Sequence, residues 1–302
     1  MCELLGMSAN VPTDICFSFA GFLQRGGGTG PHRDGWGIAF YEEGGYREFR
    51  DPHPSVDSPI ARMILDYPIK SQMVISHIRQ ANVGQVTLAN THPFTRELWG
   101  RQWCYAHNGQ LADWQTLPLP YYRPVGSTDS EHAACFLLGE IRRAFPEPPS
   151  RCEDLWRHLH AQCERLRALG VFNLLLSDGV HLYAYCSTKL AHITRRAPFG
   201  QASLTDFEMS VDFQQHTTDA DVVSVIATDP LTDNEQWQRL LPGQLVVFRE
   251  GELVASLGGE LPLSQEEQAG AGRERGGRSH RHCASQAGLA GLGPELLMPA
   301  ER

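Results

Sequence analysis

Short apolar runs of strand length recur along the chain, and turn-forming residues separate many of them. The runs are rich in β-branched and aromatic residues, which favour β-structure. The turn Ser177-Asp178-Gly179 joins two runs closely and predicts an antiparallel hairpin. The predicted strands cover residues 36–41, 73–78, 103–107, 172–177, 180–186, 222–227 and 244–249.

Four other segments carry apolar residues at the three- and four-residue spacing of a helix. Gly170 follows the fourth segment and is predicted to stop that helix, because glycine is favoured just after a helix end. The predicted helices cover residues 13–24, 58–66, 129–144 and 152–169. The helical positions expected to lie in the core include Met63, Leu65, Trp156, Leu159 and Leu166.

Predicted strands come in runs with helices grouped between them, so strand and helix do not alternate strictly. This order predicts an α+β fold with largely antiparallel sheets. The pattern fades after Leu263, where Gly, Glu, Gln, Arg and Ala dominate. We therefore expect one domain over residues 2–260 and a disordered tail over residues 264–302.

Composition and charge narrow the classes of function. A chain of 302 residues with 41% hydrophobic content can bury a sizeable core, and its net charge of -9 disfavours binding to nucleic acid or anionic membranes. We see no membrane-length apolar run and no secretion signal. The cysteines form no C-x-x-C pair, so we expect reduced thiols and a cytoplasmic protein. Histidines without zinc-ligand spacing predict no metal site.

A cysteine stands second in the chain, directly after the initiator methionine. If Met1 is removed, as is usual ahead of a small residue, Cys2 carries both a thiol and a free α-amine. The ordinary pKa of an α-amine is about 7.7 to 8.0, so this amine can accept the thiol proton near neutral pH. Cys2 is therefore a candidate N-terminal nucleophile whose own amine serves as the base.

Two further polar groups stand at the ends of predicted strands. Asn108-Gly109 offers a side-chain amide and an unhindered backbone N–H to an oxyanion, but Asn-Gly also forms tight turns readily. Arg79 can bind a carboxylate with two hydrogen bonds, but it can equally be a surface residue at a strand end. Taken alone, each group favours the structural interpretation.

A polar loop leads into the third predicted helix. Thr128 and Glu131 have the spacing of a capping box, which predicts the start of that helix. Asp129 lies in the first turn, where the helix dipole favours a carboxylate, and it could also bind a substrate ammonium group. The glycine-rich residues 26–37 lack the pattern of a phosphate loop or a dinucleotide fingerprint, so phosphate binding is not expected.

The order of these motifs carries more information than any one of them. The motifs are, in order, Cys2, Asp34-Gly35-Trp36-Gly37, His77-x-Arg79-x-Ala81, Thr91-His92-Pro93, His107-Asn108-Gly109 and Thr128-Asp129-Ser130-Glu131. As an ordered set they closely resemble the class II glutamine amidotransferase domains, which belong to the N-terminal-nucleophile hydrolases. The likeness covers about residues 2–255, and the chain looks like the stand-alone, YafJ-like members. The resemblance implies a four-layer αββα sandwich with two antiparallel sheets between helical layers.

The same resemblance implies roles for five residues. Cys2 would be the nucleophile, and its α-amine the general base and later the general acid. Asn108 and Gly109 would form the oxyanion hole. Arg79 would bind the α-carboxylate of a glutamyl group and Asp129 its α-ammonium, and these charges match those of a free amino-acid end. No cofactor enters this chemistry.

Four other residues adjoin the motifs. His77, His92 and His107 are candidate supporting residues, although hydrogen-bonded structural roles are commoner for histidines in strands and turns. Gln80 follows the key arginine where many members of the family have tryptophan. That departure leaves open how the substrate loop closes and which substrate is preferred.

Three functions remain open at this point. We favour hydrolysis of the γ-amide of glutamine or of a γ-glutamyl amide, with release of the products. The protein could instead be a glutaminase subunit that delivers ammonia to a separate synthase partner, because no segment of this sequence resembles a synthase domain. It could also be a non-catalytic ligand-binding protein of the same fold, although the presence of all five site residues argues against this.

Overall fold

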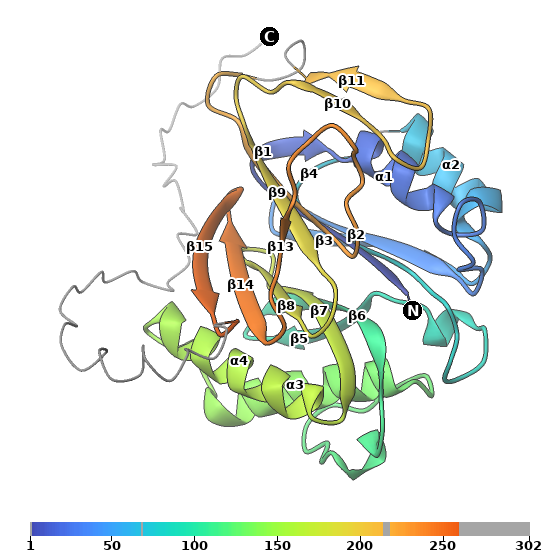
Figure 1. The fold of residues 1–302 in the computed structure, drawn as a ribbon. Coiled ribbons are helices and arrows are strands. Elements are labelled where there is room, and N and C mark those ends of the chain that lie inside the picture. Colours follow the sequence, from blue (N-terminus) through green and yellow to red (C-terminus); the bar gives the residue numbers. More distant parts are fainter. Residues whose placement is uncertain (1, 68, 214–217, 260–302) are drawn as a thin grey trace, which may run out of the picture.

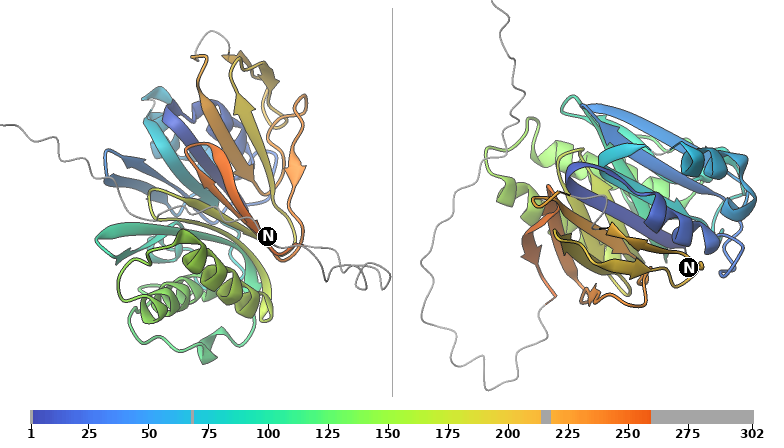
Figure 2. Two further views of the ribbon diagram at one scale, coloured as in Figure 1. Left: turned by 90° about the vertical axis from the view of Figure 1, so that its left-hand side faces the viewer. Right: turned by 90° about the horizontal axis from the view of Figure 1, so that it is seen from above.

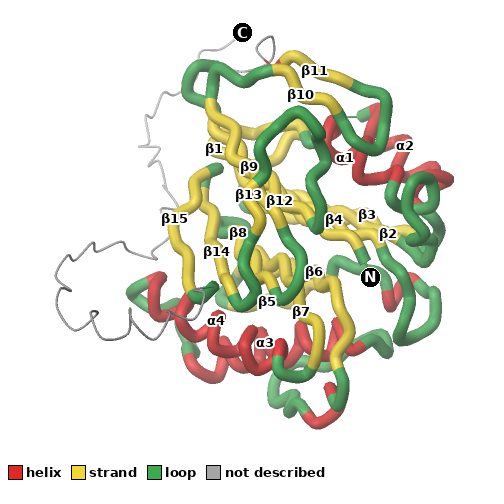
Figure 3. The backbone as a smooth tube through the Cα atoms, viewed as in Figure 1, coloured by secondary structure: helices red, strands yellow, loops and turns green. Residues whose placement is uncertain are grey.

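The computed structural model describes residues 2–67, 69–213 and 218–259. Two antiparallel sheets lie between two pairs of helices, as Figures 1 and 3 show. The left view of Figure 2 shows one sheet above the other, with α3 and α4 outside the lower sheet. This is the predicted four-layer αββα arrangement. The helices are α1 (Cys16–Gln24), α2 (Pro59–Asp66), α3 (Asp129–Ala144) and α4 (Cys152–Arg167).

The first sheet has seven strands in the order β13-β9-β12-β1-β4-β2-β3, and each neighbouring pair is antiparallel. β1 and β4 lie side by side near its middle, so the start of β1 lies beside the end of β4. The strands are β1 (Glu3–Asp14), β2 (Trp36–Glu42), β3 (Gly45–Asp51), β4 (Lys70–Ile78), β9 (Ala191–Arg196), β12 (Val222–Ala227) and β13 (Gln238–Arg239).

The second sheet has six antiparallel strands in the order β15-β14-β8-β7-β6-β5. Its strands are β5 (Phe94–Leu98), β6 (Arg101–Leu111), β7 (Gly170–Ser177), β8 (Leu182–Cys186), β14 (Gln244–Arg249) and β15 (Glu252–Leu257). Shorter elements are the pair β10 (Gln201–Ser203) and β11 (Ser210–Asp212), and the 3-10 turns η1 (Ser55–Asp57), η2 (Leu88–Asn90) and η3 (Trp114–Thr116).

Three apolar clusters fill the spaces between the four layers. One joins α1 and α2 to the first sheet, a second lies between the two sheets, and the third joins the second sheet to α3 and α4. Trp156, Leu159 and Leu166 of α4 are buried in the third cluster, as predicted. Met63 is 48% exposed and Leu65 only partly buried, because the side of α2 that faces the sheet carries Ala61 and Ile64 instead. The prediction that Met63 is a core residue was wrong.

Two helix predictions need correction at their ends. Thr13 and Asp14 belong to β1, where they pair with β4, so α1 begins at Cys16 and not at residue 13. α4 ends at Arg167, and Gly170 is the first residue of β7 and not a helix stop. A Cβ on Gly170 would lie 2.2 Å from the carbonyl oxygen of Gln110, so close strand packing explains this glycine.

Several strands were not predicted. β1 is the most important of them, and its small residues hid it from an apolar pattern. A Cβ on Gly6 would lie 3.1 Å from side-chain atoms of both Leu175 and Leu182, so a larger residue would crowd the space between the sheets. β3 and β15 are edge strands whose residues are mostly exposed or half-buried.

The remaining expectations concern thiols, membranes and the tail. Among the described cysteines, Cys2, Cys16, Cys104, Cys135, Cys163 and Cys186 are free thiols. No helix within the described ranges is both long enough and apolar enough to span a bilayer. The segment 264–302, expected to be a disordered tail, lies outside the described residues.

Candidate active site

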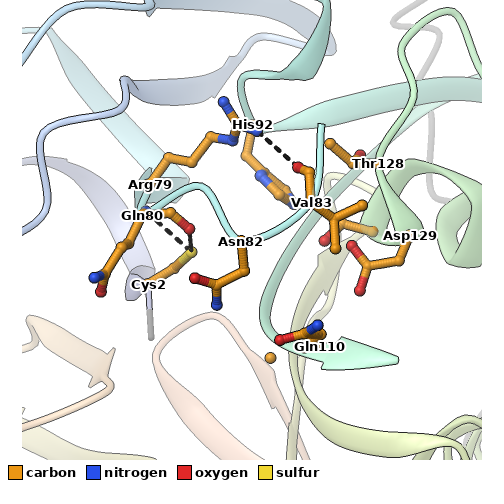
Figure 4. Close-up of a pocket in the computed structure, with 11 residues that line it drawn as sticks. Cys2, Arg79, Gln80, Asn82, Val83, His92, Gln110, Thr128 and Asp129 are labelled. Atoms are coloured by element: carbon orange, nitrogen blue, oxygen red, sulfur yellow. Dashed lines mark hydrogen bonds between the residues drawn. The ribbon is translucent and has the colours of Figure 1, made fainter. Parts of the chain in front are cut away.

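One pocket collects residues from four distant parts of the chain. Cys2 precedes β1, Arg79 follows β4, Gly109 lies in β6, and Asp129 is the first residue of α3. Figure 4 shows Cys2 and Gln80 across the pocket from Thr128 and Asp129. The cavity volume is about 20 Å³. Such a volume holds roughly one or two water molecules, so a glutamyl group needs the pocket to widen.

Cys2 is placed by the pairing of β1 with β4. Glu3 pairs with Ile78, which brings Cys2 beside the residues that follow β4. The N–H of Gln80 donates to Sγ of Cys2 at 3.3 Å, and the thiol donates to the carbonyl of Gln80 at 3.5 Å. Burial raises the pKa of Cys2 to about 11, although the Gln80 hydrogen bond and the charge of Arg79 act in the opposite direction. The thiol is therefore protonated near neutral pH.

Arg79 is buried and turned toward backbone carbonyl groups. Its two terminal nitrogens donate to the carbonyls of Val83 at 3.0 Å and Gln85 at 3.1 Å, with longer bonds to Gly84 and Asp34. No carboxylate forms an ion pair with Arg79 in the described residues. Burial lowers the pKa of Arg79, but a guanidinium stays charged at any ordinary pH. The guanidinium of Arg79 is thus a buried positive charge whose hydrogen bonds, within the described residues, go to backbone carbonyls.

Part of the edge of β6 is not paired with β5, and its backbone N–H groups can serve as hydrogen-bond donors. β5 pairs with β6 only as far as Tyr105, so the edge of β6 beyond that residue is not covered by β5. The carbonyl of His107 accepts a hydrogen bond from His77, and the N–H of Leu111 donates to Oδ2 of Asp129 at 2.9 Å. Backbone groups of alternate residues point to the same edge of a strand. The N–H of Gly109 therefore points to this edge, into the pocket that Gly109 lines.

The tight-turn interpretation of Asn108-Gly109 was wrong, because both residues lie within β6. A Cβ on Gly109 would lie 1.8 Å from the carbonyl oxygen of Val171, so the strand packing requires glycine. Asn108 is fully buried, and its Nδ2 lies 3.5 Å from Oγ1 of Thr228. Thr228 also accepts the N–H of Leu4 at 2.9 Å, which ties Asn108 to the strand that begins after Cys2.

Asp129 is presented by the start of α3, as predicted. Oγ1 of Thr128 accepts the N–H of Glu131 at 3.1 Å, which is one half of a capping box. The other half does not form, because the Glu131 carboxylate accepts from the N–H groups of Val125 and Gly126 and pairs with Arg96. The loop before α3 is held by Glu131 in this way.

Three buried histidines lie in or behind the wall of the pocket. The rings of His77 and His92 stack with centroids 3.9 Å apart, and Nδ1 of His107 is 2.9 Å from Oγ of Ser130. Burial lowers the pKa of His77 to about 3 and lowers the pKa values of His92 and His107 as well. His92 lines the pocket, whereas His77 and His107 join β4, β6 and α3 behind it. The histidines are thus uncharged packing partners of the site.

Several residues of the site were not singled out from the sequence. Asn82, Val83 and Gln110 line the pocket, and Thr228 contacts Asn108. They carry no motif of their own, since their place depends on contacts between distant segments. Within the described ranges, no group of three or more His, Cys, Asp or Glu side chains could hold a metal ion.

Comparison with known proteins places this pocket in a family. A sequence profile described as glutamine amidotransferases class-II matches residues 1–271. The chain belongs to the class II glutamine amidotransferases. Among the curated members, YafJ of Escherichia coli (strain K12) is 59% identical over 254 residues, which are 84% of this chain and 100% of YafJ.

Two solved structures are similar to this chain. The crystal structure of a "predicted glutamine amidotransferase" from Pseudomonas aeruginosa PA01 superposes with a TM-score of 0.69 at 57% identity, and covers 84% of this chain and 100% of that one. The glutamine phosphoribosylpyrophosphate amidotransferase of Bacillus subtilis gives a TM-score of 0.56 at 13% identity, over 85% of this chain and 49% of that one. This second likeness concerns the fold alone.

Proposed function

We propose that this protein hydrolyses the γ-amide of glutamine or of a γ-glutamyl amide through a glutamyl thioester on Cys2. The observation that carries the proposal is the meeting of Cys2, Arg79, Gly109 and Asp129 in one pocket. A glutamyl group has a carboxylate and an ammonium at one end and an amide at the other. Arg79 and Asp129 supply the opposite charges for the first end, and Cys2 with Gly109 supply a nucleophile and a donor for the second.

The buried thiol explains why an adjacent base is required. With a pKa raised to about 11, the Cys2 thiol holds its proton near neutral pH. Removal of Met1 would leave an α-amine on the same residue, with an ordinary pKa of about 7.7 to 8.0. In the proposed first step this amine takes the thiol proton while Sγ attacks the γ-carbonyl carbon. The carbonyl electron pair moves to the oxygen, which the N–H of Gly109 and the side-chain amide of Asn108 stabilise.

Collapse of the tetrahedral intermediate completes the first half of the reaction. The carbon–nitrogen bond breaks, and the ammonium of Cys2 returns its proton to the leaving nitrogen, which departs as ammonia or an amine. Water then attacks the thioester, losing a proton to the same amine, and the sulfur leaves as the Cys2 thiol. Glutamate is the second product, and the enzyme returns to its starting state.

Arg79 links substrate binding to the loop that follows β4. Its terminal nitrogens donate to the carbonyls of residues 83–85 and Asp34. A substrate carboxylate that binds with two hydrogen bonds must displace some of these carbonyls. We therefore propose that residues 80–85 move outward as substrate enters, which also enlarges the small pocket.

The direct assay is release of glutamate and ammonia from glutamine by the purified protein without any partner. We expect activity that is abolished in Cys2→Ala and retained in Cys16→Ala and Cys104→Ala. Equal loss in all three variants would show general thiol sensitivity and not one nucleophile. Activity that appears only with a synthase partner would favour the ammonia-delivering subunit.

A further inference from the structure

A buried asparagine interrupts the apolar residues of β7. Asn173 lies between Phe172 and Leu174 and pairs directly with Asn108 of the neighbouring strand β6. Its side chain is completely buried. A buried amide is tolerated when its donors and acceptor are satisfied, and Asn173 forms five hydrogen bonds. Its two ends serve different parts of the structure.

The oxygen of this side chain holds a turn. Oδ1 of Asn173 accepts the N–H groups of Ser187, Thr188 and Lys189 at 2.9, 3.0 and 3.2 Å. These residues follow directly after β8. The acceptor end of Asn173 therefore anchors the turn after β8 against β7, which is a structural role.

The nitrogen of the side chain holds the backbone next to the pocket. Nδ2 of Asn173 donates to the carbonyl oxygen of Asn108 at 3.1 Å and to Oγ1 of Thr188 at 2.9 Å. The carbonyl of Asn108 and the N–H of Gly109 belong to the same planar trans peptide unit, so they point in opposite directions. A group that holds this carbonyl toward β7 also holds the Gly109 N–H toward the pocket.

We propose that Asn173 is a positioning residue for the oxyanion hole. It fixes the Asn108–Gly109 peptide plane from behind, and its hydrogen bond polarises that peptide and strengthens the Gly109 N–H as a donor. The inference rests on the proposed function, because it assigns the oxyanion to this N–H. Asn173 itself does not touch the substrate.

The two roles of Asn173 depend on different atoms, so they can be separated. Asn173→Asp keeps an oxygen for the three N–H groups of the turn but replaces the Nδ2 donor with an oxygen facing the Asn108 carbonyl. Thr188→Val removes the second acceptor of Nδ2 and leaves its bond to Asn108. If Asn173 only anchored the turn, Asn173→Asp would keep its activity.

The experiment measures kcat and KM for glutamine in the full-length variants. Rates are divided by the fraction of Cys2 that 6-diazo-5-oxo-norleucine labels, so that unfolded molecules do not count. Loss of one oxyanion donor costs about 100- to 1000-fold in kcat, and a misaligned donor costs part of that. For Asn173→Asp and Asn173→Ala we expect kcat per labelled site to fall about tenfold or more, with KM within about twofold.

Two controls accompany these variants. Thr188→Val should keep the wild-type kcat. Asn10 bridges backbone groups of Ala220 and Val222 by 2.8 Å hydrogen bonds in the same manner but away from the pocket, so Asn10→Ala should also keep it. If Asn173→Asp does not fold, the kcat per labelled site of Asn173→Ala tests the positioning role.

The outcomes distinguish this inference from the proposed function. Wild-type kcat per labelled site in the Asn173 variants would overturn the positioning role and leave the proposed reaction intact. Wild-type protein that neither hydrolyses glutamine nor is labelled at Cys2 would overturn the proposed function itself.

Discussion

The N–H of Gln80 donates to Sγ of Cys2 at 3.3 Å, and the same thiol donates to the carbonyl of Gln80 at 3.5 Å. Cys2 is therefore held by both backbone groups of the residue that follows Arg79. Movement of this loop changes the surroundings of the thiol and of the guanidinium together. Entry of the substrate and activation of the nucleophile are coupled by this contact in our account.

The pH dependence of Cys2 alkylation tests the environment of the thiol. The thiolate is the reactive form, and burial raises the pKa of Cys2 to about 11 from an ordinary 9.0. Below the pKa, the thiolate fraction grows about tenfold per pH unit. We expect labelling by iodoacetamide, mapped by peptide mass spectrometry, to accelerate steadily from about pH 7 to about pH 10. A labelling rate already independent of pH between about pH 7 and about pH 9 would contradict a thiol that is protonated at neutral pH.

Replacement of Arg79 by lysine tests the anchor for the carboxylate. Lysine keeps the charge but cannot form two parallel hydrogen bonds to a carboxylate. Loss of a charged hydrogen bond costs about 1.5 to 3 kcal/mol, so we expect KM for glutamine to rise about tenfold to 100-fold in Arg79→Lys. The matched control is Arg33→Lys, because Arg33 also donates to a loop carbonyl, that of Gly27, on an exposed surface. Equal KM values in the two variants would exclude the proposed role of Arg79.

Two glycine substitutions test the packing that places the donor N–H. In Gly109→Ala the new Cβ would lie 1.8 Å from the Val171 carbonyl oxygen, so β6 and β7 must separate. We expect the free energy of unfolding to fall by about 2 kcal/mol or more, with loss of activity. In Gly139→Ala of α3 the nearest atom is 3.8 Å away, and the protein should gain about 0.5 to 1 kcal/mol. Chemical denaturation measures the free energy of unfolding of both variants. An unchanged free energy of unfolding in Gly109→Ala would contradict the close packing of β6 against β7.

Acid should destabilise the protein partly through His77. Burial lowers the folded-state pKa of His77 to about 3, against an ordinary 6.5 in the unfolded chain. Below about pH 6.5 the imidazole is protonated in the unfolded state but stays neutral in the folded state. The free energy of unfolding therefore falls as the pH drops from 6.5 toward 3. Between about pH 6 and about pH 4, wild type should lose about 1.4 kcal/mol per pH unit more than His77→Gln. Identical slopes in urea titrations would contradict a buried neutral imidazole.

The buried strands that consist mainly of apolar residues could be predicted from the sequence. Strands with small or charged residues could not. β7 and β12 are apolar because both of their faces are covered, and their patterns identified them. β1 is equally buried, but Gly6, Ser8 and Ala9 make it narrow where the sheets approach closely. The edge strand β3 carries charged residues, so its pairing with β2 is visible only in the structure.

The site could be predicted in part because its motifs occur in the same order as in the class II glutamine amidotransferase domains. Arg79 follows the end of a predicted strand and Asp129 begins a predicted helix, and the structure brings both to the pocket. Thr228 and Asn173 could not be found in this way. They lie 120 and 65 residues from Asn108, and their contacts with it arise from pairing between strands distant in sequence. A single asparagine within the apolar run of β7 was the one local signal for Asn173.

The central claim is that Cys2 is an N-terminal nucleophile in a pocket for glutamyl groups. Intact-protein mass spectrometry before and after treatment with 6-diazo-5-oxo-norleucine tests it most directly, with Cys2→Ala as control. We predict that Met1 is absent, that one adduct forms and maps to Cys2, and that Cys2→Ala forms none. Retained Met1, or a treated protein without an adduct at Cys2, would contradict the account.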